Sequence, residues 1–193
     1  MTDEQPLIDR AQQGDGDAFR QLVERSNLNV YRLAYDMTGN RHDAEDLVQE
    51  VYIRAYRSLG NFRREAKWST WLYRITINIC LDHRSSKARK PLEYTDSIGD
   101  DTKNELPHGR ARSTPDRETE SSMIRENIER ALSTLPPQER SVFVLRHYHD
   151  LPLKEIAETL QVAEGTVKSH LFRALQKLRE ELAFYRNDLG LEN

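Results

Sequence analysis

Apolar residues recur at helical spacing between residues 43 and 59. Leu47, Val51 and Ala55 follow one another at intervals of four, which places them on a single face of a helix. Asp43 precedes this stripe, and aspartate is among the residues that best accept hydrogen bonds from the first free amides of a helix. We therefore predict an amphipathic helix capped at its N-terminus by Asp43.

Short polar breaks divide the rest of the N-terminal region. Residues 15–17 and 38–40 each contain a glycine, and such segments interrupt the helical pattern that otherwise runs from residue 3 to residue 87. A loop follows residue 59, and Ser69 or Thr70 is expected to cap the next helix. Several helices in succession are predicted here, without strands.

The composition changes after this region. Residues 91–120 contain prolines, glycines and many acidic or hydroxyl side chains, but few large apolar ones, as in a flexible linker. The helical pattern resumes after it, and Pro136 and Pro137 are expected to begin a helix because proline is well tolerated in the first turn. The fold class is therefore predicted to be all-α: a helical domain over residues 1–90, a flexible acidic linker over 91–120 and a second helical domain over 121–193.

The C-terminal domain has the pattern of a helix-turn-helix. A short amphipathic helix is expected over residues 153–160, a tight turn over 161–165 and a long helix from about Thr166. The positions expected to be buried between these helices are Ile156, Ala157, Leu160, Val167, Leu171, Ala174, Leu175, Leu178 and Leu182. The outward side chains near the start of the second helix are Lys168, Ser169, His170, Phe172 and Arg173. Such side chains can reach base edges and phosphates in the major groove, although an ordinary helical hairpin with a solvated basic face is the alternative.

The charge distribution supports nucleic-acid binding. The net charge is -3, yet residues 61–92 carry 8 basic and 2 acidic side chains. Residues 165–179 carry lysines and arginines but no carboxylate. Phosphate contacts require such local positive charge. The two basic segments lie beside the two most distinctive motifs of the chain.

Other classes of function are disfavoured. The N-terminus lacks the apolar run of a secretory signal, and no stretch has the length of a membrane span, so a cytoplasmic protein without membrane insertion is expected. A single cysteine, Cys80, rules out an internal disulfide framework or a multi-cysteine zinc site. His147 and His149 are close in sequence, but two residues apart on a helix they point about 200° away from each other. No cofactor, metal or enzymatic activity is therefore expected.

Four segments in order resemble the extracytoplasmic-function sigma factors, the smallest members of the primary sigma factor family. Residues 43–59, DAEDLVQEVYIRAYRSL, resemble the family's polymerase-binding helix, and residues 61–83, NFRREAKWSTWLYRITINICLDH, its promoter-melting segment. Residues 135–160 and 165–180 are similar to the two parts of its domain for the upstream promoter element. Each segment alone is moderately specific, whereas all of them in register are highly so.

The resemblance implies a sigma factor that binds core RNA polymerase, recognises the minus-10 and minus-35 elements and promotes opening of the promoter. Its polymerase contact falls on Asp46, Leu47, Gln49, Glu50 and Arg54. The partners implied are the clamp helices of the largest polymerase subunit, the beta subunit, promoter DNA and an anti-sigma factor. Spacings of three and four also put the polar members of this set on one helical flank.

The minus-10 contacts that the resemblance implies are Phe62, Arg63, Arg64, Lys67, Trp68, Ser69, Arg74 and Asn78. Asn78 lies at the position of the family's base-reading asparagine, and an amide offers both a donor and an acceptor to a base edge. Arg74, Arg84, Lys87 and Arg89 are expected to contact phosphates. Trp71, Leu72, Tyr73 and Ile75 are expected in the core instead, and Trp68 could belong to either class.

The minus-35 contacts that it implies are Arg146, Thr166, Lys168, Ser169, His170, Phe172, Arg173 and Lys177. Ala163 departs from the family pattern, which often has serine there as the N-cap of the recognition helix. Gln161 lies near a position that glycine often takes in other helix-turn-helix proteins, so the geometry of the turn is open.

Two alternatives remain at this point. TVKSHL also resembles the output domain of response regulators of the LuxR type, but residues 1–90 show neither strand alternation nor a Gly-rich loop. A nucleic-acid enzyme could use Asp43, Glu45, Asp46 and Glu50 with a divalent metal, but no histidine accompanies them and one helix rarely supplies a complete site.

Overall fold

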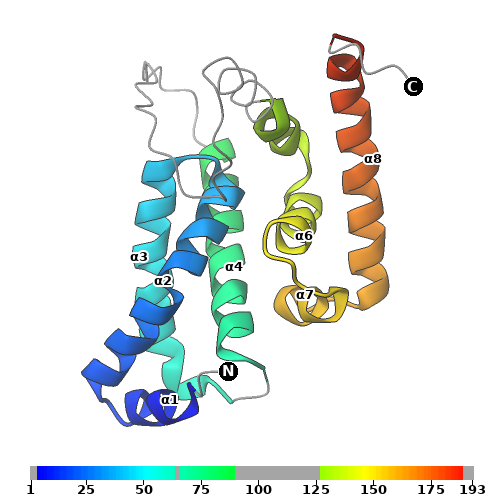
Figure 1. The fold of residues 1–193 in the computed structure, drawn as a ribbon. Coiled ribbons are helices and arrows are strands. Elements are labelled where there is room, and N and C mark those ends of the chain that lie inside the picture. Colours follow the sequence, from blue (N-terminus) through cyan, green and yellow to red (C-terminus); the bar gives the residue numbers. More distant parts are fainter. Residues whose placement is uncertain (1–3, 64–65, 90–126, 189–193) are drawn as a thin grey trace, which may run out of the picture.

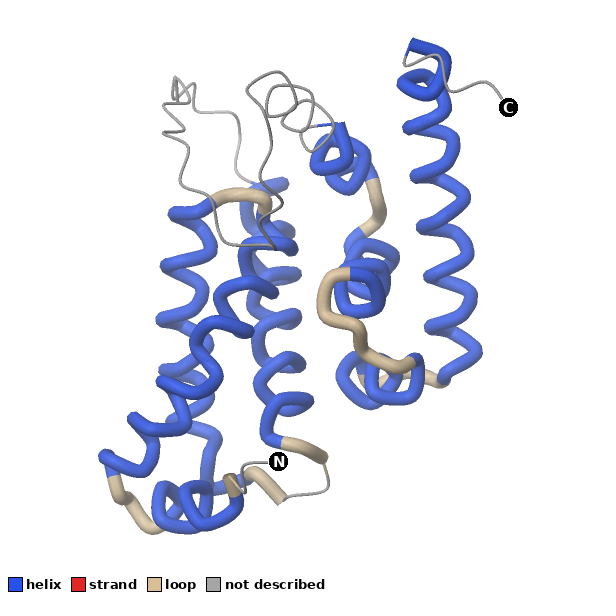
Figure 2. Tube along the Cα trace, in the orientation of Figure 1, coloured by secondary structure: helices blue, strands red, loops and turns tan. Residues whose placement is uncertain are grey.

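A computed structural model describes residues 4–63, 66–89 and 127–188, and for residues 88–89 and 184–188 it describes the backbone alone. The described residues form helices and no strand (Figure 2), which confirms the all-α prediction. The helices are α1 (Gln5–Gln12), α2 (Gly16–Thr38), α3 (Arg41–Ser58), the 3-10 helix η1 (Leu59–Asn61), α4 (Trp68–Arg89), a helix over 127–134, α6 (Pro137–His147), α7 (Leu153–Leu160) and α8 (Glu164–Asp188). The predicted linker over residues 91–120 lies outside the described residues.

Polar side chains start the N-terminal helices. The Oδ1 atom of Asp15 accepts hydrogen bonds from the amides of Asp17 and Ala18, both at 3.0 Å, and so caps α2. Asn40 caps α3 by accepting from the amide of Asp43 at 3.0 Å, after Gly39 has ended α2 with φ at +69°. The prediction that Asp43 is the cap was wrong, because the helix begins at Arg41 and Asp43 lies in its first turn, where its amide donates to Asn40.

The loop before α4 also ends differently from the prediction. α4 begins at Trp68, and the amide of Trp71 donates to the carbonyl of Lys67 at 3.1 Å. Ser69 and Thr70 therefore lie inside the first turn, and neither is the residue before the helix. Packing of Trp68 against Trp71 fixes this earlier start, since their ring centroids are 5.0 Å apart.

Helices α2, α3 and α4 lie side by side and bury a common core (Figure 1). Leu22, Leu33, Val51, Leu72 and Ile77 are almost fully buried within it. We call α1 to α4 the N-terminal unit. Trp71, Leu72 and Tyr73 lie in the core as predicted, and Ile75 packs against it.

The C-terminal unit, residues 127–188, contains the predicted helix-turn-helix. α7 has the predicted limits, whereas α8 begins at Glu164, two residues earlier than expected. Gln161 ends α7 in the left-handed region at φ +56°, so the turn forms with a glutamine in the conformation that glycine adopts most easily.

The buried stripe of α8 is narrower than predicted. Val167, Ala174 and Leu178 are buried, but Leu175 is 43% exposed. α8 extends beyond α7, so there only α6 and the helix over 127–134 cover it (Figure 1). The prediction that Leu175 is buried was wrong for this reason.

The two units pack against each other. α6 and α7 lie beside α2 and α4, and apolar residues of both units join one buried cluster. Val142, Leu145 and Ile156 of the C-terminal unit are fully buried in it. The outer face of α8 is turned away from the N-terminal unit (Figure 1).

Candidate functional site

One flank of α3 presents polar side chains to solvent. Asp46, Gln49 and Arg54 are exposed there, and Glu50 is partly so. The Nε atom of Arg54 donates to Oε1 of Glu50 at 2.7 Å, and its Nη1 atom lies 3.7 Å from Oδ2 of Asp82 on α4. The predicted spacing therefore does place these four side chains on one accessible surface.

Leu47 does not belong to this surface. It is only 8% exposed, because it lies in the apolar stripe that packs into the core. Its direct contact with a partner stays a prediction, because the structure shows only that the side chain faces the core. Ile53 is an exposed apolar side chain of this flank, at 45%, that was not predicted. The available signal was its spacing of four residues after Gln49 and three after Glu50.

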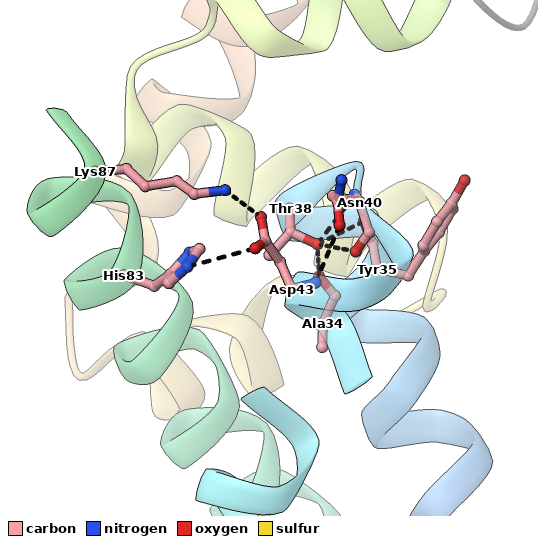
Figure 3. A network of polar contacts seen from close by, with 7 residues as sticks. All are labelled: Ala34, Tyr35, Thr38, Asn40, Asp43, His83 and Lys87. Atoms are coloured by element: carbon pink, nitrogen blue, oxygen red, sulfur yellow. Dashed lines mark hydrogen bonds and ion pairs between the residues drawn. The ribbon is translucent and has the colours of Figure 1, made fainter. Parts of the chain in front are cut away.

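A polar network fastens α3 to the end of α4 (Figure 3). Oδ2 of Asp43 accepts from Nζ of Lys87 at 2.6 Å, and its Oδ1 lies 3.7 Å from Nε2 of His83. Lys87, expected at a phosphate, thus has a protein partner. Among the described residues, no group of three or more His, Cys, Asp or Glu side chains is placed to hold a metal ion.

Two aromatic residues expected at the minus-10 DNA are buried. Phe62 is 6% exposed and Trp68 is 3% exposed, and with Trp71 they form a cluster whose ring centroids lie 5.0 to 5.8 Å apart. Packing against one another removes both rings from solvent, and their contact with bases stays a prediction. In this conformation they fix the loop that precedes α4.

The polar candidates of α4 fall on two faces. Lys67, Arg74 and Asn78 are separated by seven and four residues, which places them along one face, with Asn78 and Lys67 exposed and Arg74 half-buried. Ser69 is exposed but lies nine residues before Asn78, on the opposite side of the helix. Arg63 is exposed in the preceding loop, and Arg64 lies outside the described residues.

The first turns of α8 form a basic surface with an exposed aromatic ring. Lys168, Ser169, Phe172 and Arg173 line a shallow depression, and Phe172 is 68% exposed. Ser169 donates from Oγ to the carbonyl of Gly165 at 2.9 Å. Thr166 is exposed just before this surface, while His170 is half-buried beside it.

The remaining minus-35 candidates are tied to the protein itself. Arg146 donates from Nη1 to the carbonyl of Leu151 at 3.1 Å and so holds the turn after α6. Lys177 donates from Nζ to Oε2 of Glu139, and Glu139 is only 4% exposed. Glu139 was not predicted as part of this surface, because an acidic residue in a first helical turn is usually solvated.

The two histidines of HYHD do not face each other. His149 pairs through Nε2 with Oδ2 of Asp36 at 3.1 Å, and the ring of His147 lies against Phe143. His149 therefore contacts the N-terminal unit.

Comparison with known families and proteins agrees with this arrangement. The profile described as Sigma-70 region 2 matches residues 22–90, and that described as Sigma-70, region 4 matches residues 125–178. ECF RNA polymerase sigma factor SigW of Bacillus subtilis is 35% identical over 178 residues, covering 91% of this chain and 94% of the relative. The ECF RNA polymerase sigma-E factors of Haemophilus influenzae and Escherichia coli are 35% and 34% identical, and cover 94% and 92% of this chain and 96% and 93% of their own lengths.

Among the solved structures that match, two share this fold over most of the chain. CnrH in complex with the cytosolic domain of CnrY matches with a TM-score of 0.64 and 23% identity, over 92% of this chain and 95% of that one. Sigma factor RpoE of Bartonella quintana, in complex with the anti-sigma factor NepR, matches with a TM-score of 0.61 and 23% identity, over 86% of this chain and 96% of that one. In the described part of the chain, no helix is both long and apolar enough to cross a membrane.

Proposed function

Because the chain belongs to the extracytoplasmic-function (ECF) family of RNA polymerase sigma factors, we propose that α3, α4 and α8 carry its three functional surfaces. It is a promoter-recognising transcription initiation factor, and this family is not a known class of enzyme. The division proposed is polymerase binding and promoter melting in residues 1–90, a linker over 91–120, and upstream-element binding in residues 121–193.

We assign polymerase binding to the exposed flank of α3. Asp46, Gln49, Glu50 and Arg54 give it alternating charge, and Ile53 adds an apolar contact at its centre. Such a surface suits the charged exterior of a coiled coil, because complementary charges guide the approach and an apolar residue adds affinity. The proposed partner is the pair of clamp helices in the largest polymerase subunit. The contact with the beta subunit rests on the family resemblance.

Minus-10 recognition is assigned to the face of α4 that bears Lys67, Arg74 and Asn78. The exposed Asn78 amide can both donate to and accept from the edge of an extruded base, which offsets part of the lost stacking. The two cations can contact the displaced strand. Arg63 is exposed in the loop before this face and can add a phosphate contact, whereas Ser69 lies on the opposite side of α4. Phe62 and Trp68 fix the loop before this face from within the core.

Minus-35 recognition is assigned to the start of α8, and one observation supports it most strongly. Phe172 is 68% exposed between cationic side chains at the N-terminal end of the second helix of a helix-turn-helix. Exposing a large ring to water brings no benefit to folding, but the ring can meet a thymine methyl while Lys168 and Arg173 reach guanines or phosphates.

An anti-sigma partner and a cytoplasmic location complete the proposal. The family resemblance implies such a partner, and the two solved structures described above are both complexes, one of them with the anti-sigma factor NepR. A partner that covers α3 or α8 could block polymerase or DNA.

The proposal is tested by run-off transcription with core polymerase on genomic fragments, together with co-purification of the chain and the core enzyme. The double variant Asp46→Asn, Glu50→Gln is expected to weaken co-purification at least tenfold. Asp17→Asn, which neutralises an exposed carboxylate on α2, is the matched control. Duplex binding without core binding favours a conventional regulator instead. A metal-dependent nuclease activity that disappears with Asp46 and Glu50 overturns the sigma assignment.

A further inference from the structure

A small polar cluster joins the two units at Asp36 on α2. The Nη2 atom of Arg140 on α6 donates to the main-chain carbonyl of Asp36 at 2.8 Å. The carboxylate of the same residue pairs with Nε2 of His149 at 3.1 Å. Arg140 is 7% exposed, and the side chains of His149 and Asp36 are 6% and 14% exposed. One residue of the N-terminal unit therefore holds two nearly buried side chains of the other.

This cluster depends on the two units remaining in contact. Burial and the nearby charge of Arg84 lower the pKa of Arg140, while Asp36 acts in the opposite direction. The His149 ring also packs edge-on against Tyr73 of α4, with centroids 5.5 Å apart. Burying polar groups costs free energy unless their hydrogen-bond partners stay in place. Each hydrogen bond across the contact thus favours the packed arrangement.

The C-terminal unit also occupies two cations that are expected at DNA, Lys67 on the proposed minus-10 face and Arg84 at a phosphate. Lys67 donates to Glu155 of α7, and this hydrogen bond raises the pKa of Lys67. Arg84 donates from Nη2 to the carbonyls of Ser133 and Leu135 at 2.8 and 3.4 Å. DNA that approaches α4 has to compete with these contacts.

Distance along the promoter adds a further constraint. The minus-10 and minus-35 elements are about 25 base pairs apart, or about 85 Å at about 3.4 Å per pair. A compact chain of 193 residues has a radius of gyration of about 16 Å, so its diameter is about 40 Å. On straight DNA, α4 and α8 cannot reach both elements while the two units stay packed together.

We infer that Asp36, Arg140 and His149 form a latch that keeps the free chain closed, and that its release must precede simultaneous contact with both promoter elements. This inference rests on the proposed function for what the opening achieves. The latch itself is a property of the chain alone. It can therefore be tested without polymerase or DNA.

The test measures the distance between spin labels on the full chain by double electron–electron resonance. Labels are attached at Asn27→Cys on α2 and Gln176→Cys on α8, both exposed sites; the native Cys80 is 3% exposed and remains unlabelled. The otherwise unchanged chain is expected to give one short distance. His149→Ala is expected to increase the population at longer distances about tenfold, as expected for a lost buried hydrogen bond.

His147→Ala is the matched control, because His147 is exposed two residues away and contacts Phe143 of its own helix. Asp36→Ala is the second latch variant, since Asp36 is partly exposed and alanine suits a helix. Unchanged distances in both latch variants, or an equal change with His147→Ala, overturn the latch.

Addition of core polymerase is expected to give the long distances without any latch substitution. If the latch variants lengthen the distance but core polymerase does not bind, the latch stands and the proposed function fails. If polymerase binds and supports transcription while the short distance persists, the inferred release is wrong and the sigma function stands.

Discussion

Lys177 of α8 donates a hydrogen bond from Nζ to the buried carboxylate of Glu139 on α6, at 3.0 Å. The other carboxylate oxygen of Glu139 lies 3.9 Å from Nη1 of Arg173. A carboxylate that is almost removed from water needs such cationic partners. The hydrogen bond thus helps to fix the packing of α8 on α6. Lys177, expected to contact DNA, therefore also has a structural role.

Lys177→Ala is therefore expected to lower the free energy of unfolding by about 1 to 3 kcal/mol, because it leaves a buried acceptor without its nearest donor. Urea denaturation followed by circular dichroism measures the change. Lys168→Ala is the matched control, since Lys168 is exposed on the same helix and should alter the free energy by less than about 0.5 kcal/mol. Equal losses for the two variants contradict the structural role of Lys177.

Lys168→Ala should instead act on DNA affinity. Each neutralised phosphate contributes about 0.9 to the slope of log K against log salt concentration, so the variant is expected to lower that slope by about this amount. Binding of the holoenzyme to a cognate promoter fragment over a salt series measures it. If the slope changes for Lys177→Ala and stays constant for Lys168→Ala, Lys177 and not Lys168 contacts a phosphate.

Periodicity predicted most of the helices because burial on one face has to repeat with the helical turn. The limits of α7 and the proline start of α6 follow directly from such local signals. Local signals could not choose between Asn40 and Asp43 as the cap of α3, since both residues are good caps. Tertiary contact decided it, because the Asp43 carboxylate turns toward Lys87 on another helix.

Side chains that could serve either a core or a surface were the hardest to place from the sequence. Leu47 and Trp68 belong to segments that resemble functional ones, but apolar stripes and aromatic clusters bury them. Leu175 fits the helical period, yet it is 43% exposed, because none of the described helices covers that side of α8. The contact of His149 with Asp36 joins residues 113 positions apart, and no spacing rule within a single sequence reveals such a pair.

Cys80 should be protected from alkylation in the folded chain. Burial raises the pKa of its thiol from 9.0 to about 12, and the thiolate is the reactive form. At pH 8 we expect maleimide labelling at least a hundredfold slower than in urea-unfolded chain. Because the folded pKa is the higher one, the stability contributed by this thiol is complete below pH 9 and decreases as the pH rises towards 12. Labelling as fast as in the unfolded chain contradicts the burial.

Asn78→Ala is expected to impair promoter opening and leave polymerase binding unchanged. Losing amide contacts to an extruded base should reduce the open fraction about tenfold. Permanganate reactivity of unpaired thymines measures opening, and co-purification with core polymerase measures binding. Asn27→Ala, which removes an exposed amide from α2, is the control and should leave both unchanged. Normal opening with Asn78→Ala removes Asn78 from the proposed base contact.

Ala163→Ser should stabilise the C-terminal unit. The carbonyl of Ala163 accepts hydrogen bonds from the amides of Thr166 and Val167, at 2.9 and 3.2 Å, so Ala163 is the N-cap residue of α8. Its methyl group cannot accept from the first free amides, whereas a serine hydroxyl can, and the gain is about 1 kcal/mol. Thermal denaturation should show a higher Tm.

Ala183→Ser is the control, because it places the same hydroxyl at an exposed site inside α8. It is expected to lower the stability by up to about 0.5 kcal/mol, because serine is a weaker helix former than alanine. A higher Tm for Ala163→Ser with a lower Tm for Ala183→Ser identifies capping as the cause. A lower Tm for both variants shows that the turn after Gln161 does not present the hydroxyl to these amides.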